Sequence, residues 1–462
     1  MPVRDYPEVT HSPHWQNLNP RLGVAFDLFG DGKTALKASL GRYSYRDVGV
    51  AVDIPSANTP QNVTRSWNDT FYPVGDPRRG NFVPDCDLKN GLANGECGQW
   101  NDLNFGQTNV PPSYHRAQDA LNGFNKQSYN WQGSISVQRQ LAPNMSVNVG
   151  YFRTTYGGFL AMDNRAVTPA DYDKFCITAP VDPKLPSNVS GKQFCGIGDL
   201  KPAKFGQVDN LITQASHYGN MSDVWDGFDA IYNLRFGRGG NFQGTFSTGR
   251  EKVDNCLVID SPSGLIAGLP PTGGGNANLL PPGGQPSATN LPNDNRPGFC
   301  RFAQPWSGGT GFGFLAVYPL PGSIQVSGIY QNKPGFPIRA SYVVSDAEVS
   351  RSLGRHLSSC PSQTAATCSQ TVPIDLIPNI PNVNIGSMYG ERIKQLDMRF
   401  SRIFKFGERR KVQANFDVYN IFNNNTVLNE QTRYTTAANN PWRNVLQIMG
   451  GRLVKLGAQV NF

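Results

Sequence analysis

Apolar and polar residues alternate with a period of two along many segments of this chain. In one segment Trp131, Ile135 and Val137 alternate with glutamines and serines. Such alternation predicts β-strands that have one apolar and one polar face. Eleven segments show the pattern, and we expect strands of roughly 9 to 14 residues at each, longer than is usual in globular sheets. The segments lie at residues 22–28, 34–40, 131–141, 145–151, 228–236, 242–247, 314–318, 324–330, 396–400, 412–418 and 454–462.

The polar faces of these strands argue against a soluble β-sandwich. They hold mainly Gln, Asn, Ser, Asp, Arg and Gly, as at Gln132, Ser134 and Gln138. The dry core of a sandwich does not accept so many unpaired polar groups, whereas a water-filled lumen does. A tilted strand of the expected length also spans the hydrocarbon layer of a membrane. The pattern therefore predicts an all-β, antiparallel transmembrane barrel.

The connections between the strands alternate between short and long. An up-and-down barrel in an outer membrane has short periplasmic turns and long external loops. Long loops without structure are unusual in a compact soluble domain, which favours the membrane interpretation. The short turns lie at 30–32, 142–144, 237–240, 319–322 and 405–410, and the long loops at 46–127, 157–225, 253–311, 343–391 and 423–449.

The eight cysteines fall into neighbouring pairs, and every pair lies within one long loop. None forms the close C-x2–4-C spacing of a zinc site. We therefore expect four disulfides that staple the loops, with eight unrelated thiols as the alternative. The expected pairs are Cys86–Cys97, Cys176–Cys195, Cys256–Cys300 and Cys360–Cys368.

Disulfides imply an oxidising compartment, yet the first residues show no signal peptide. We therefore expect the true start of the protein to lie upstream of Met1.

Composition excludes several other classes of protein. Aromatic residues make up 11% of the chain and charged residues only 16%, which fits neither a disordered chain nor a coiled coil. No segment has the run of roughly 18 apolar residues that a membrane-spanning helix needs. The formal net charge is +8, but the Lys and Arg residues are scattered, so we expect no nucleic-acid partner.

The order of several short motifs resembles that of the TonB-dependent transporters of the outer membrane. It is most similar to the subfamily that carries a carboxypeptidase-regulatory-like domain before its plug. Single motifs are weak, but their order across nearly the whole chain is fairly specific. They are Asn-Pro-Arg-Leu-Gly-Val-Ala-Phe-Asp at 19–27, Gly-Asp-Gly-Lys-Thr at 30–34, Pro-Leu-Pro-Gly at 319–322 with Pro-Gly-Phe-Pro at 334–337, Gln-Leu-Asp-Met-Arg-Phe-Ser at 395–401, Phe-Asp-Val-Tyr-Asn-Ile-Phe-Asn at 416–423, Gly-Arg at 451–452 and the terminal Phe462.

The resemblance implies that residues 1–462 form a single domain, about half of a 22-stranded barrel. If Phe462 ends strand 22, the strand that begins near Arg21 is strand 12. The plug and the N-terminal half of the barrel would then lie outside these residues. Family members take up an extracellular ligand with energy supplied through TonB, which contacts the plug. The resemblance thus implies a receptor in the cell outer membrane that is not an enzyme and has no cofactor.

Phe462 ends the last alternating segment. A terminal aromatic residue on the lipid face would lie in the periplasmic girdle. It also resembles the signal by which the barrel assembly machinery recognises outer-membrane proteins. We expect this machinery and the lipid of the outer membrane to be partners of the chain.

Few residues suggest a binding site. Asp85, Asp87 and Glu96 loosely resemble a calcium loop, but Lys89 occupies a ligand position, so a solvated acidic loop is the stronger interpretation. We expect no other metal site and no catalytic residues, because neither a metalloprotease motif nor a nucleophile elbow is present. Loop aromatic residues are candidates for ligand contact, with membrane anchoring or loop packing as the alternative: Trp67, Tyr72, Trp100, Trp225, Trp306 and Trp442.

The charged residues on the polar faces have two interpretations. They could pair with one another across strands, or they could contact a substrate or the plug. The residues are Asp229, Arg235, Asp397, Arg399 and Asp417.

Two other functions remain open at this point. The chain could be a secreted or surface β-rich adhesin or carbohydrate-binding protein, or a passive porin-like barrel. Recovery of the protein without detergent would contradict the membrane prediction, and only the presence of a plug separates a transporter from a porin.

Overall fold

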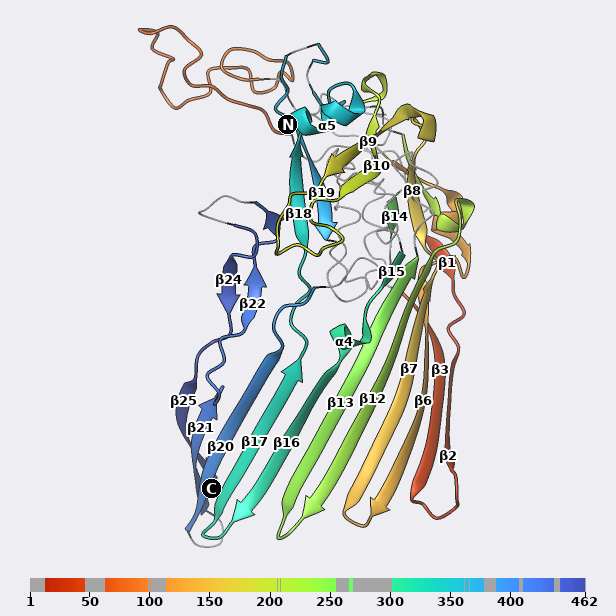
Figure 1. Ribbon diagram of the computed structural model, residues 1–462, viewed down its shortest axis with the longest axis vertical. Helices are drawn as coiled ribbons and strands as arrows, with labels where there is room; N and C mark the ends of the chain where they lie inside the picture. The colour runs from red at the N-terminus through yellow and green to blue at the C-terminus, as the bar shows by residue number, and fades with distance from the viewer. Residues whose placement is uncertain are drawn as a thin grey trace.

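The computed structural model describes residues 13–45, 63–98, 100, 114–205, 207, 209–254, 266–268, 301–360, 362–364, 366–377, 388–406, 410–435 and 441–461. These residues form one large, curved, antiparallel sheet with smaller sheets above one end (Figure 1). Eleven strands succeed one another across the large sheet, here called the main sheet. They are β2 (Arg21–Asp27), β3 (Thr34–Ser44), β6 (Tyr129–Ala142), β7 (Met145–Gly157), β12 (Ser222–Phe236), β13 (Gly240–Asp254), β16 (Gly311–Leu320), β17 (Ile324–Lys333), β20 (Ile393–Phe406), β21 (Arg410–Tyr419) and β25 (Leu453–Asn461).

Each strand of the main sheet pairs antiparallel with the next one in the sequence. The short strand β15 (Arg301–Ala303) adds to the upper end of β13. The prediction of an all-β, up-and-down sheet of eleven strands is confirmed. Within the described residues the sheet is open, with β2 and β25 as its two edges.

The two faces of the main sheet differ in chemistry as the alternation predicts. One face, here called the apolar face, carries exposed aliphatic and aromatic side chains, among them Leu22 (71% exposed) and Leu456 (77% exposed). Aromatic rings meet across neighbouring strands on this face, with Phe314 and Tyr330 5.4 Å apart. The other face, here called the polar face, carries Gln, Asn, Ser and charged residues. So much exposed apolar surface requires an apolar environment, which lipid supplies.

The described short connections lie together at the lower end of the sheet in Figure 1, here called the turn end. In the turn between β2 and β3, Gly30 and Gly32 adopt positive φ angles of 71° and 69°. Asp27 Oδ2 accepts a hydrogen bond of 2.7 Å from the main-chain nitrogen of Gly32. Asp27 therefore stabilises a tight turn between the two strands.

Five smaller sheets accompany the main sheet, most of them at the end opposite the turns (Figure 1). The described parts of the long loops are thus folded, because they contain short strands that pair with one another. The sheets are β1 (His14–Gln16) with β5 (Asn122–Phe124); β14 (Ile266–Gly268), β8 (Leu160–Asn164), β11 (Asn210–Gln214) and β4 (Tyr114–Arg116); β9 (Tyr172–Thr178) with β10 (Gln193–Leu200); β19 (Thr371–Ile377), β18 (Ala340–Ser345) and β23 (Arg433–Tyr434); and β22 (Val427–Glu430) with β24 (Val445–Ile448).

Helices are few and short in the described part of the chain, and the longest of them is α5. Among the described residues, none of them has the length and apolar character to cross a membrane. They are α2 (Gln118–Leu121), α4 (Trp306–Gly309), α5 (Asp346–Leu353) and the 3₁₀ helices η1 (Pro169–Asp171), η2 (Pro202–Lys204) and η3 (Ala215–His217).

Candidate functional site

The loop end of the molecule has a hydrophobic core of its own. Segments that are far apart in the sequence meet there: β9 and β10, β18 and β19, α5, and Tyr434 with Trp442. Val344, Val349 and Leu376 are fully buried. We call these elements together with β23 the cap. Because the cap has a packed core, it holds its surface residues in a defined arrangement.

Two disulfides reinforce the cap, and a third closes a separate loop. Cys176 and Cys195 face each other directly across β9 and β10. Cys360 and Cys368 close a short loop after α5, and Cys86 pairs with Cys97 in the loop of residues 63–98. Three of the four predicted disulfides are therefore present, and Cys256–Cys300 lies outside the described residues.

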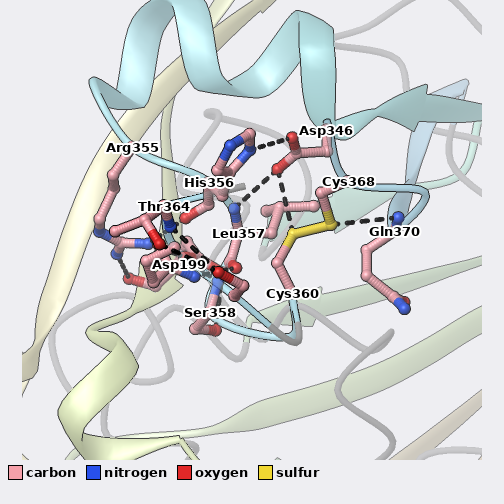
Figure 2. The surroundings of a disulfide bond; sticks show 12 residues. Asp199, Asp346, Arg355, His356, Leu357, Ser358, Cys360, Thr364, Cys368 and Gln370 are labelled. Atoms are coloured by element: carbon pink, nitrogen blue, oxygen red, sulfur yellow. Dashed lines mark hydrogen bonds and ion pairs between the residues drawn. A yellow bond between two sulfur atoms is a disulfide. The ribbon is translucent and has the colours of Figure 1, made fainter. Parts of the chain in front are cut away.

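Figure 2 shows the polar network beside the Cys360–Cys368 disulfide. Asp346, which is 1% exposed, accepts a hydrogen bond of 2.8 Å from the main-chain nitrogen of Leu357, and its other oxygen lies 2.5 Å from His356 Nδ1. These contacts anchor the segment after α5 against the first turn of that helix.

The same segment is also tied to β9 and β10. Arg355 makes ion pairs with Asp173 (2.8 Å) and Asp199 (2.6 Å). Burial raises the pKa of the Asp199 carboxyl, and hydrogen bonds from Arg355 and Ser358 oppose this rise. The network thus holds together segments that lie more than 150 residues apart in the sequence.

A groove of about 500 Å³ lies on the side of β18 and β19 that faces away from the cap core. Alternation along the strands explains why polar residues line this side. Val372, Ile374 and Leu376 point into the core, while the intervening residues point outward. Two arginines, one carboxylate and several hydroxyl groups line the groove. Such a lining suits a polar ligand with negative charge or several hydrogen-bonding groups. The residues are Arg339, Ser341, Val343, Thr371, Pro373, Asp375, Thr432 and Arg433.

A second hollow, of about 600 Å³, lies on the apolar face. Its lining includes Phe314, Tyr330 and Leu396, which belong to the lipid-facing positions of three neighbouring strands. Lipid fills such a hollow in a membrane, so the cap groove is the candidate site for a water-soluble ligand.

The polar face carries a ladder of paired side chains. Arg399 Nε lies 2.6 Å from Asp417 Oδ1 and Arg399 Nη2 lies 3.0 Å from Oδ2, so the guanidinium binds the carboxylate with two hydrogen bonds. One row below, Ser401 Oγ donates to Asn415 Oδ1 over 2.7 Å. Among the predicted charged positions, Arg399 and Asp417 therefore pair across β20 and β21. The Oδ1 atom of Asp229, by contrast, is buried without a partner in the described part of the chain.

The six predicted aromatic candidates lie in four different places. Trp67, Tyr72 and Trp100 belong to the loop of residues 63–100, in which Trp67 Nε1 donates to Glu96 Oε2 over 2.9 Å and Arg78 lies 3.6 Å over the ring of Tyr72. Trp225 lies on the polar face, where its ring covers Gly227 and Gly249 so closely that a side chain at either glycine would collide with it.

The last two aromatic candidates have structural partners. The ring of Trp306 lies 5.8 Å from that of Phe228 on the apolar face, as expected of membrane anchoring. Trp442 is only 2% exposed and packs 5.5 Å from Tyr434 in the cap core. Trp442 therefore offers a ligand no accessible surface, in keeping with the alternative of loop packing.

The three acidic residues of the loose calcium motif do not converge. Glu96 accepts hydrogen bonds from Trp67 and from the main-chain nitrogen of Asp85, whereas Asp87 Oδ1 accepts one from the main-chain nitrogen of Lys89. Across the described ranges, one group of three metal-ligand atoms lies within 4.8 Å: Asp346, Cys360 and Cys368. Its two sulfurs form a disulfide, so this group has no thiolate to bind a metal.

The groove residues were not predicted from the sequence. One signal for them is present, since Thr371, Pro373 and Asp375 alternate with three apolar residues within a long loop. Arg339 and Arg433 carry no such signal, because they lie 94 residues apart in the sequence and meet only when β18 pairs with β23.

A family model described as "Outer membrane beta barrel domain" matches residues 3–243. No curated protein matches the sequence. Similar solved structures include the outer membrane transporter YddB from Escherichia coli, with 12% identity, a TM-score of 0.41, and coverage of 96% of this chain and 40% of that chain. The siderophore receptor PirA from Acinetobacter baumannii has 10% identity, a TM-score of 0.37, and coverage of 96% and 40%.

The ferripyoverdine receptor of the outer membrane of Pseudomonas aeruginosa has 10% identity, a TM-score of 0.35, and coverage of 96% and 33%. The chain therefore spans less than half the length of each of these three proteins.

Proposed function

The chain belongs to the outer membrane beta barrel domain family, and we propose that within this family it is the C-terminal barrel portion of a TonB-dependent receptor. Its location is the cell outer membrane. The proposed receptor binds a scarce extracellular ligand at the cap and admits it to the periplasm without covalent chemistry. The single domain of residues 1–462 would supply about half of the barrel wall and the cap above it.

The observation that carries the proposal is a sheet with one polar face and, at the loop end of that sheet, a cap with a groove (Figure 1). A membrane sheet with a polar inner face lines a water-filled path. The cap stands at the loop end of this path, is reinforced by disulfides, and carries a groove with two arginines. A preorganised groove in the cap suits ligand capture, and the polar face of the sheet suits passage of a water-soluble ligand.

The finer parts of the proposal rest on the motifs that resemble the family. They favour the subfamily with a carboxypeptidase-regulatory-like domain. They also imply a plug that contacts TonB, and recognition of the chain by the barrel assembly machinery. Phe462, the proposed assembly signal, lies outside the described residues.

A passive porin-like barrel is the second candidate function. The open polar face is compatible with free diffusion, and the two functions differ in their need for energy. A surface adhesin is the third candidate function. An adhesin would bind its ligand without taking it up.

Uptake by whole cells tests the proposal. Cells that express the complete gene receive radiolabelled iron chelates, glycans or peptides, with and without a protonophore that removes the proton gradient. We expect uptake of one of these classes, abolished by the protonophore. Uptake that is insensitive to the protonophore would support the porin, and binding without uptake would support the adhesin.

Two variants locate the binding site. R339Q/R433Q removes the positive charge of the groove, and we expect it to lower ligand affinity about tenfold or more, because charge-assisted hydrogen bonds are lost. R402Q/R410Q removes two arginines at the turn end and should leave affinity unchanged. Equal affinity of R339Q/R433Q and the wild type would exclude the groove as the site.

A further inference from the structure

A row of charged side chains crosses the apolar face of the main sheet. Arg153 on β7 and Arg250 on β13 lie directly opposite Asp226 on β12, one on each side. Lys252 lies two residues above Arg250. Charged residues are unexpected on the lipid-facing side of a membrane sheet, because contact with hydrocarbon is costly for them.

The single carboxylate in this row is already engaged. Asp226 Oδ1 accepts a hydrogen bond of 2.6 Å from the hydroxyl of Tyr151 and lies 3.0 Å from Arg153 Nη1. Its Oδ2 lies 3.9 Å from Lys252 Nζ. Three cations therefore surround one anion, which leaves a surplus of positive charge. The next carboxylate on this face, Asp254, lies two residues further toward the cap.

Arg250 has no hydrogen bond or ion pair with the described residues. Its guanidinium carbon lies 4.8 Å from the ring centroid of Trp306, and its Nε is buried without a partner. The side chains of Arg153 and Lys252 are 51% and 44% exposed. The row therefore presents exposed cationic side chains, whose donors exceed the single carboxylate among them, to whatever lies outside the sheet.

The position of the row corresponds to the membrane interface. Below it on β12, the nine residues from Phe228 to Phe236 are about the length that a tilted strand needs to cross the hydrocarbon layer. Immediately below the row are the rings of Tyr151, Phe228 and Trp306, and aromatic residues of this kind gather at membrane interfaces. In an outer-membrane barrel the loop end faces outward, so the row lies at the level of the headgroups of the outer leaflet.

We propose that Arg153, Arg250 and Lys252 form a binding site for the phosphate groups of an anionic lipid headgroup in the outer leaflet. Charge complementarity selects this occupant, because arginine and lysine bind phosphate oxygens through charge-assisted hydrogen bonds. The acyl chains of such a lipid then lie along the apolar face beneath the row. The proposal depends on the outer-membrane location of the chain and not on the transport function.

Native mass spectrometry of the full chain tests this site. The protein is purified in neutral detergent and titrated with lipid A, whose phosphates make it anionic, or with phosphatidylcholine, whose phosphate charge is balanced by its choline group. We expect the wild type to retain lipid A in preference to phosphatidylcholine. R250Q/K252Q should weaken lipid A retention about tenfold, and the charge-conserving R250K/K252R should restore most of it.

The control R402Q/R410Q removes two arginines from the same face at the turn end. Like Arg250, Arg402 lies over an aromatic ring, with its guanidinium carbon 5.1 Å from the ring centroid of Phe404. We expect it to bind lipid A like the wild type. If R250Q/K252Q fails to fold, K252Q alone should still weaken retention about threefold. Unchanged retention in R250Q/K252Q, an equal loss in the control, or equal retention of phosphatidylcholine would overturn the proposal. Displacement of lipid A by inorganic phosphate, added at the same concentration of phosphate groups, would also overturn the proposal.

Discussion

The indole Nε1 of Trp442 donates a hydrogen bond of 3.0 Å to the main-chain carbonyl oxygen of Arg339. Trp442 is buried in the cap core, whereas the Arg339 side chain lines the groove on the other side of the cap sheet. The tryptophan thus fixes the main chain at one end of the groove without contacting its contents.

The variant W442F is expected to loosen the cap. It keeps an aromatic ring beside Tyr434 but leaves the carbonyl of Arg339 without its donor, which costs about 1–3 kcal/mol for a buried group. Hydrogen exchange in β18 and β19 should therefore become faster. The matched variant W67F removes an indole donor in a separate loop and should leave exchange in these two strands unchanged. Unaltered exchange in W442F would show that the hydrogen bond contributes nothing to the cap.

Removal of the Cys360–Cys368 disulfide is expected to destabilise the cap alone. Its cysteines are 8 residues apart, and loop-closure entropy for a loop of this size corresponds to about 2–3 kcal/mol. In C360A/C368A, limited proteolysis should cut the segment after α5 faster, while the main sheet stays resistant. Cleavage of the main sheet at the same rate would indicate that cap and sheet unfold together.

The pair Arg399–Asp417 is expected to stabilise the sheet modestly. Asp417 is 3% exposed, but the Arg399 side chain is 47% exposed, so water screens much of the attraction. A double-mutant cycle with R399Q and D417N, measured by urea unfolding in detergent, should give a coupling energy of about 1 kcal/mol. R399K keeps the charge but loses the two-pronged contact, and should retain less than half of this energy. A coupling energy indistinguishable from zero would contradict the prediction.

Alkaline pH is expected to open the cap through Tyr434. Burial, together with its hydrogen bond to Asp182, raises the pKa of Tyr434 to about 12 from a usual value near 10. The folded state therefore holds this proton more tightly than the unfolded state. Its contribution, about 2–3 kcal/mol, is fully present below pH 10 and is lost as the pH rises toward 12.

Cap unfolding followed by near-ultraviolet circular dichroism from pH 9 to 12 measures this effect. Y434F lacks the ionisable group, so its stability should fall less steeply over the same range. Identical pH profiles for the two proteins would assign the alkaline transition to other groups.

The main sheet was predictable because its signal is local. In β12 the alternation from Phe228 to Phe236 marks the strand within nine residues, since lipid and water impose opposite demands on its two faces. The structure extends this strand upward to Ser222, so residues 222–225, which the pattern assigned to a long loop, belong to the strand. Asp226 breaks the alternation there, because the strand has left the hydrocarbon layer and polar residues are tolerated on both faces.

The cap and its groove were not predictable in the same way. The contact between Arg355 and Asp199 joins residues 156 positions apart, and no periodicity reports such a separation. Trp442 illustrates the limit, because an aromatic residue in a long loop can equally contact a ligand or pack in a core. Only the tertiary arrangement decides between these roles.

The directions of the two edge strands restrict how the barrel wall can be completed. Every pairing from β2 across the sheet to β25 is antiparallel, so these two strands run the same way across the membrane. They cannot pair antiparallel with each other, and an even number of inserted strands would leave the same mismatch. A second copy joined edge to edge by a two-fold axis in the membrane plane would place its cap on the opposite side of the bilayer. A closed antiparallel wall therefore needs an odd number of additional strands, whatever polypeptide supplies them.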